Sequence, residues 1–112
     1  MNLKRSKYLF DIQSAIDRIY IHIKEVKNIK DYSANVTVKS AVEREFEIIG
    51  EAMKNLLDIE PNIEITNPQK IVALRNRIIH GYDTIDDILI YQVFQDHVPL
   101  LKKEVDKLLD SE

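Results

Sequence analysis

The apolar side chains in the first 26 residues recur with the spacing of a helical seam. They follow one another at intervals of 3, 4, 3, 4 and 3 residues, at Leu9, Ile12, Ile16, Ile19, Ile23 and Val26. This spacing keeps them on one face of an α-helix, so it predicts a helix over residues 4–26 that packs against other helices. The 112 residues include only two glycines and three prolines, which are the residues that disfavour helices most. We therefore expect an all-α fold.

The middle of the chain predicts a second long helix with a short helical piece before it. An apolar stripe indicates a helix over residues 37–57. Residues 28–34 mix turn-forming with apolar residues and leave room for a short fifth helix. Glu45 falls inside the apolar arc of the second helix, where a carboxylate needs a partner, an interface or an edge position. Glu51 lies on the flank away from the apolar stripe, where a solvated position is the simpler interpretation.

The last helix is predicted over residues 85–109. Thr84 and Asp87 resemble a capping pair at its start. Pro99 should bend the helix, because its ring displaces the carbonyl four residues back. Together the elements predict an up-and-down bundle of four main helices, forming a single domain over residues 1–112.

Composition excludes several classes of protein. Cysteine is absent, so the chain has no disulfide framework and no thiolate chemistry. No apolar run approaches the roughly 18 residues that span a bilayer, and no signal-type apolar core follows the start of the chain. No cluster of His, Asp and Glu has the spacing of a metal site, and no glycine-rich phosphate loop occurs. We expect a cytoplasmic protein that needs no metal and no cofactor.

The third predicted helix carries the most basic stretch of the chain. It should begin with Asn67 as N-cap and Pro68 as the first helical residue, and end near Gly81. The chain has a net charge of −3, but residues 67–82 include three basic residues and no acidic one: Lys70, Arg75 and Arg77. The acidic total argues against broad nucleic-acid binding, yet it allows a local basic groove. Charge that alternates between helix surfaces is the simpler interpretation of any one segment.

Arg75 and His80 lie on different faces of this third helix. At about 100° per residue Arg75 falls among the apolar side chains, whereas Asn76 and His80 share the opposite side and can touch. Arg75 and His80 are then about 140° apart. To act on one phosphate, Arg75 must reach around, the helix must unwind near Gly81, or a second subunit must contribute.

Each of these residues also has an ordinary structural interpretation. Arg75 can form a buried ion pair with a glutamate of the second helix, Glu45 being one candidate. His80 can favour the helix dipole, and Tyr82 can be an ordinary half-buried loop residue. His22 and His97 have no companions at ligand spacing, and His97 is predicted to pack in the core.

Taken together, the side chains of this segment indicate RNA cleavage without a metal ion. A histidine gives or takes a proton near neutral pH. An arginine neutralises the charge that builds on the phosphate oxygens when a ribose 2′-OH attacks.

At these residues the chain resembles the HEPN-domain superfamily, and within it the HepT-like toxin ribonucleases. The HepT-like signature is Arg, four residues, His, one residue and Tyr, which here reads Arg75, Asn76-Arg77-Ile78-Ile79, His80, Gly81, Tyr82. Residues 41–52 resemble the same group, and the resemblance covers essentially the whole chain.

The resemblance implies a function and a site. It implies a homodimeric helical bundle in which two motif copies face one cleft, and an endoribonuclease that leaves a 2′,3′-cyclic phosphate without metal. Arg75 and His80 would be the catalytic pair, with Asn76 positioning them, while Arg77 and Lys70 would support RNA binding. The implied partner is a minimal nucleotidyltransferase antitoxin that attaches AMP to Tyr82.

Two other functions compete with a toxin ribonuclease. One is a non-catalytic helical dimer of the same fold that binds a nucleotidyltransferase or a nucleotide. The other is a plain structural interaction bundle. The Arg-Asn-His set favours the ribonuclease, because a binding-only bundle has no need of His80. The acidic total charge favours the other two.

Overall fold

Helices make up almost all of the regular structure. The computed structural model describes residues 2–81 and 86–112, and these residues contain helices and no strand. The helices are α1 (Leu3–His22), α2 (Ile29–Ala34), α3 (Val36–Ile59), α4 (Pro68–His80), α5 (Asp87–Asp96) and α6 (Val98–Asp110). The prediction of an all-α fold is confirmed, and so is the short helix near residues 28–34.

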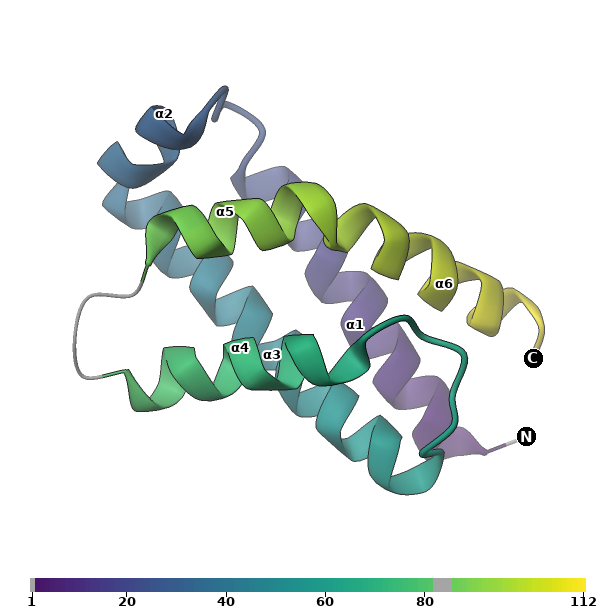
Figure 1. Ribbon diagram of the computed structural model, residues 1–112. Coiled ribbons are helices and arrows are strands. Elements are labelled where there is room, and N and C mark those ends of the chain that lie inside the picture. Colours follow the sequence, from purple (N-terminus) through teal and green to yellow (C-terminus); the bar gives the residue numbers. More distant parts are fainter. Residues whose placement is uncertain (1, 82–85) are drawn as a thin grey trace.

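The long helices α1 and α3 lie side by side and carry the others. Figure 1 shows α1 and α3 behind, with α4, α5 and α6 crossing in front of them. In this arrangement α4 packs on α3, while α6 packs on α1 and α2 packs on α5. The predicted bundle is therefore built on an α1–α3 pair, with α4 along one flank.

The core is formed by the apolar seam that the sequence predicts. In α1 the seam residues Leu9, Ile12, Ile16 and Ile19 are fully buried. They meet the fully buried stripe of α3, which consists of Val42, Phe46, Ile49, Met53 and Leu56. The helix α1 ends at His22, four residues earlier than predicted, because the chain turns at residues 23–25. Burial of this apolar surface is the main contribution to the stability of the fold.

The predicted C-terminal helix is divided into two. The helix α5 ends at Asp96, and α6 begins at Val98 with Pro99 in its first turn. Proline has no backbone N–H and fits only the first turn of a helix, so the chain starts a new helix around it. The prediction of one bent helix over residues 85–109 was wrong in this respect.

Asparagine and aspartate side chains cap several helices. Asp86 caps α5 by accepting hydrogen bonds from the backbone N–H of Ile88 and Leu89, at 3.0 and 3.3 Å. The predicted cap at Thr84 lies outside the described residues. Asn67 precedes Pro68 as predicted, but it has a left-handed backbone, with φ of 48°, and its side chain makes no capping hydrogen bond.

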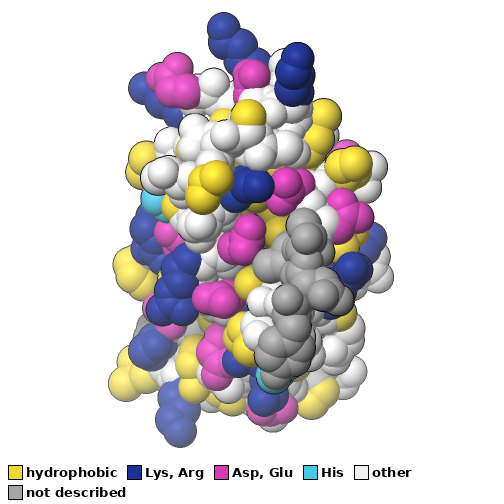
Figure 2. Space-filling model, turned by 90° about the vertical axis from the view of Figure 1, so that its left-hand side faces the viewer, with side chains coloured by type: hydrophobic (Ala, Val, Ile, Leu, Met, Phe, Trp, Pro, Cys, Tyr) yellow, Lys and Arg dark blue, Asp and Glu magenta, His cyan; other side chains and the backbone are white. Residues whose placement is uncertain are grey.

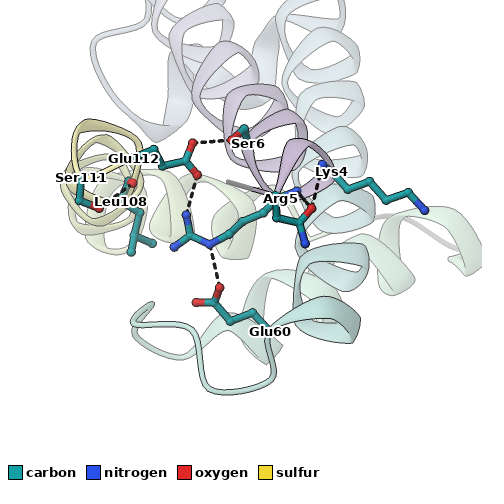
Figure 3. A network of polar contacts seen from close by, with 8 residues as sticks. Lys4, Arg5, Ser6, Glu60, Leu108, Ser111 and Glu112 are labelled. Atoms are coloured by element: carbon teal, nitrogen blue, oxygen red, sulfur yellow. Dashed lines mark hydrogen bonds and ion pairs between the residues drawn. The ribbon is translucent and has the colours of Figure 1, made fainter.

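An ion-pair network joins the ends of three helices. Figure 3 shows Arg5 of α1 between Glu60, which follows α3, and Glu112, which follows α6. Its Nε donates to Glu60 at 2.7 Å and its Nη1 donates to Glu112 at 2.6 Å. Such partly exposed pairs add little stability individually, but this one fixes the relative positions of three helix ends. Across residues 2–81 and 86–112 no helix is both long and apolar enough to cross a membrane.

Candidate active site

The helix α4 buries one face and leaves its polar face open. Ile71, Leu74 and Ile78 are buried in the core. The polar side chains predicted to belong to the site are exposed on the same helix: Lys70, Asn76, Arg77 and His80. No residue of α4 is acidic. Because the apolar residues of α4 face the core, these polar groups face outwards.

A glycine of α3 brings α4 unusually close. Gly50 is buried, and a Cβ atom added to it would lie 2.6 Å from Cγ of Arg75 and closer still to Cβ of Arg75. Only a residue without a side chain fits there. The absence of a side chain at Gly50 thus sets the position at which Arg75 passes over α3.

Arg75 is held in place by two polar contacts. Its Nη2 lies 2.8 Å from a carboxylate oxygen of Glu51, and its Nη1 donates to the amide oxygen of Asn76 at 3.1 Å. Its Nε is buried and has no hydrogen-bond partner. The ordinary interpretation of Arg75, a buried ion pair with a glutamate of the second long helix, holds in part. The partner is Glu51 and not the candidate Glu45, and the Glu51 side chain is 52% exposed.

Glu45 has partners on α1 instead. Its carboxylate is buried, accepts from Nε of Arg18 at 2.9 Å and lies 2.9 Å from Nε2 of His22. The prediction that a carboxylate at this position needs a partner is confirmed. Glu51, interpreted from the sequence as solvated, is exposed but pairs with Arg75.

Asn76 and His80 share the exposed side of α4 as the helical wheel predicts. No hydrogen bond joins them among the described residues, and the amide oxygen of Asn76 accepts from Arg75 instead. The long guanidinium thus reaches a residue that the wheel places on another face. Tyr82 lies outside the described residues.

A groove that the sequence did not reveal opens beside Arg75. It lies between α1, α3 and α4 and has a volume of about 350 Å³. Arg75 and Ile79 of α4 line it, together with Tyr8 of α1 and Ile48 of α3. The glycine inside the α3 pattern was the one available signal, because a helical glycine often marks a close approach of another backbone.

The other candidate groups have structural surroundings. His97 is 9% exposed, at the junction of α5 and α6, and burial together with nearby Lys70 lowers its pKa. Its predicted place in the core is confirmed. In the part of the chain described, no three His, Asp or Glu side chains are close enough to bind a metal ion. Figure 2 shows basic and acidic side chains of the described residues interspersed over one face of the molecule.

An all-α bundle with an Arg-x4-His motif on an exposed helix is the arrangement expected of the HEPN class. A family model described as ribonuclease HepT-like matches residues 12–108. The chain therefore belongs to the HepT-like ribonuclease family.

Individual relatives agree with this assignment. A protein of Thermococcus cleftensis named "Probable ribonuclease HepT" is 32% identical over 109 residues, which are 95% of this chain and 98% of the relative. A protein of Methanocaldococcus jannaschii named as a "Putative RNase" is 32% identical over 100 residues, 88% of this chain and 91% of the relative. Another "Putative RNase", from Caldanaerobacter subterraneus, is 32% identical over 93 residues, 80% of this chain and 83% of the relative. No solved structure matches the chain significantly.

Proposed function

We propose that the chain is the toxin of a toxin–antitoxin system and cleaves RNA without a metal ion. The observation that carries this proposal is the acid-free helix α4, which exposes Asn76 and His80 while Glu51 and Asn76 hold Arg75. A chain of the ribonuclease family with a histidine and an arginine so placed has the groups that phosphodiester cleavage requires. Its place of action would be the cytoplasm, where it meets cellular RNA.

The proposed reaction is an attack of a ribose 2′-OH on its own phosphate. The O2′–P bond forms and the P–O5′ bond breaks, which gives a 2′,3′-cyclic phosphate and a free 5′-OH. His80 takes the proton of the 2′-OH or gives one to the leaving 5′-oxygen. Arg75 stabilises the charge on the non-bridging oxygens, and Asn76 holds its guanidinium. Lys70 and Arg77 bind the flanking phosphates.

A homodimer completes this proposal. Each chain supplies one motif histidine, whereas the reaction has one proton to remove and one to donate. Two copies that face each other through α4 would bring two His80 side chains to one cleft. Within residues 2–81 and 86–112, α4 packs chiefly on α3 and its polar side chains are exposed for this contact.

Regulation is proposed to act on Tyr82. A minimal nucleotidyltransferase antitoxin would transfer AMP from ATP to the Tyr82 hydroxyl, releasing pyrophosphate. The adduct carries a phosphate two residues from His80, so it would occupy the cleft and repel the RNA backbone.

Incubation with total RNA in the presence of EDTA tests the ribonuclease. Wild type should cleave, and His80→Ala should lower the rate by about 10²–10⁴ fold. Gln69→Ala, another exposed position of α4, is the matched control and should cleave as wild type does. Mass spectrometry of the products should find 2′,3′-cyclic phosphate ends. Equal cleavage by wild type and His80→Ala, or cleavage by neither, would leave the non-catalytic dimer as the better account.

Mass spectrometry after incubation with the proposed nucleotidyltransferase partner and ATP tests the modification. The intact protein should gain the mass of one AMP, and Tyr82→Phe should not. Tyr20→Phe is the control and should still be modified. An AMP adduct on Tyr82→Phe would exclude Tyr82 as the acceptor.

A further inference from the structure

The groove between α1, α3 and α4 has the size and the lining of a nucleobase site. Its volume of about 350 Å³ lies at the lower end of the range for small-molecule sites. Tyr8 contributes an aromatic ring and Ile48 and Ile79 contribute apolar surface. Because Arg75 lines the same groove, a nucleotide whose phosphate contacts Arg75 has its base within reach of these side chains.

The charges around the groove are balanced. Three of its basic side chains are each paired with an acidic side chain that also lines it. The pairs are Lys7 with Asp11 at 2.7 Å, Arg44 with Glu47 at 3.2 Å, and Arg75 with Glu51 at 2.8 Å. Their formal charges cancel, so the groove offers no net attraction to a second phosphate. A neutral ring is the part of a nucleotide that fits such a lining.

Tyr8 is placed to support that ring. It is half-buried, and Nζ of Lys7 lies 5.5 Å from the centre of its ring. A base that stacks on an aromatic side chain gains affinity whatever its sequence, because every base has a π-face. Stacking thus accounts for binding, whereas discrimination between bases must come from the polar groups.

In two of the groove's ion pairs the carboxylate is the less exposed partner. The side chains of Asp11 and Glu47 are 33% and 26% exposed, against 67% and 70% for Lys7 and Arg44. The less exposed polar groups of the lining are therefore acceptors, which favour bases that donate hydrogen bonds. Ionised carboxylates only accept hydrogen bonds, so they match the exocyclic amino groups of cytosine, adenine and guanine. Uracil has a carbonyl oxygen where cytosine has its amino group, and that oxygen would face another acceptor. We propose that the groove binds the base next to the scissile phosphate and prefers amino-bearing bases to uracil. This inference rests on the proposed ribonuclease function.

CMP and UMP are the matched probes, because their bases differ at the amino group and the adjacent ring nitrogen. In a ¹⁵N NMR titration of the intact protein, both should shift backbone amides of residues 7–11 and 47–55. CMP should bind about threefold or more tightly than UMP, which corresponds to one additional net hydrogen bond. Shifts confined to α4, or equal affinities for CMP and UMP, would overturn the proposal.

Variants on α1 and α3 separate stacking from discrimination. Tyr8→Leu should weaken both nucleotides about tenfold, whereas Tyr20→Leu, on the same helix, should not. The double variant Asp11→Asn with Glu47→Gln should reduce the ratio of CMP to UMP affinity to about one. Asp17→Asn with Glu25→Gln is its control and should keep the ratio. A preference for CMP that survives in the first double variant would contradict the role of the carboxylates.

The titration does not depend on catalysis, so the two proposals fail separately. A wild-type protein that binds CMP in the groove but leaves RNA intact would refute the ribonuclease proposal alone. If wild type cleaves RNA without preference for the flanking base, and Tyr8→Leu cleaves at the same rate as wild type, the groove proposal fails alone. A circular-dichroism melt of each variant confirms that it is folded.

Discussion

Glu45 of α3 and Arg75 of α4 are both charged side chains that pair across helices, but their surroundings differ. Glu45 is 5% exposed, and both its oxygens have partners on α1, Arg18 and His22. Arg75 is half-buried, holds Glu51 and Asn76, and retains a buried Nε without a partner. The closed cluster, Glu45 with Arg18 and His22, lies within the α1–α3 pair. The open cluster, Arg75 with Glu51 and Asn76, borders the groove and the exposed face of α4.

The difference separates stability from chemistry. A buried carboxylate with both oxygens hydrogen-bonded inside the fold stabilises one arrangement of two helices. Because it is buried, it is not accessible to a ligand. An arginine at a groove edge, on the same helix as an exposed histidine, can exchange contacts with an incoming phosphate. We therefore expect substitutions at the Glu45 cluster to lower stability, and substitutions at the Arg75 cluster to lower activity.

Among the substitutions that compare the two clusters, the largest loss of cleavage is expected for Arg75→Lys. Lysine keeps the charge but lacks the planar fork that contacts Glu51 and Asn76, so cleavage should fall about 10²–10³ fold. The unfolding free energy should change by less than about 1 kcal/mol. Initial cleavage rates and urea unfolding measure the two quantities. Arg18→Lys makes the same chemical change in the closed cluster and should cleave almost as wild type; an equal loss there would erase the distinction.

Glu45→Ala should give the largest loss of stability. It removes two hydrogen bonds to the carboxylate and leaves their donors on α1 without a partner, which should lower the unfolding free energy by about 2 kcal/mol. Arg18 is 43% exposed at its side chain and turns to water, which limits the cost. Urea unfolding measures this loss.

Glu51→Ala, whose side chain is 52% exposed, should lose less than about 1 kcal/mol of unfolding free energy but most of the activity. The reverse order would contradict the comparison.

Gly50→Ala tests whether the close approach of α4 maintains the open cluster. Alanine gains up to about 1 kcal/mol in helix propensity, but its Cβ would collide with Cβ and Cγ of Arg75, and that Cβ cannot move without the backbone. Overpacking costs about 1–3 kcal/mol, so we expect net destabilisation and reduced cleavage. Ser40→Ala, exposed on the same helix, is the control. A Gly50→Ala protein that is more stable and fully active would show that the approach is not required.

Sequence periodicity predicted the parts of this molecule that depend on one helix at a time. The seam of α1, the stripe of α3, the start of α4 at Pro68 and the core position of His97 all follow from local spacing. These positions are fixed by which face of a helix is apolar, and a single sequence carries that information.

Local spacing does not predict which residues of different helices meet. Glu45 and Glu51 both lie on α3, and only the register of α4 against α3 decides which of them meets Arg75. The resemblance implied that Asn76 positions Arg75, but the helical wheel did not show their contact. A wheel places Cβ atoms, whereas a guanidinium reaches well beyond its own Cβ. We predicted a bend where the structure divides α5 from α6. Proline is compatible with either a kink within one helix or the start of a new helix.

The smallest effect is expected at the exposed cations of α4, and it sharpens the boundary of the open cluster. Arg77 is exposed and has no ion pair among the described residues, so Arg77→Ala should weaken single-stranded RNA binding only about two- to fivefold. Binding is measured in the His80→Ala background, to prevent cleavage, over a series of salt concentrations. Loss of one phosphate contact should reduce the slope of log affinity against log salt by about 0.7. Lys103→Ala, exposed on α6, should leave the slope unchanged. A cation that contacts the RNA backbone releases counterions when it binds. Equal slopes for both variants would therefore show that Arg77 makes no such contact.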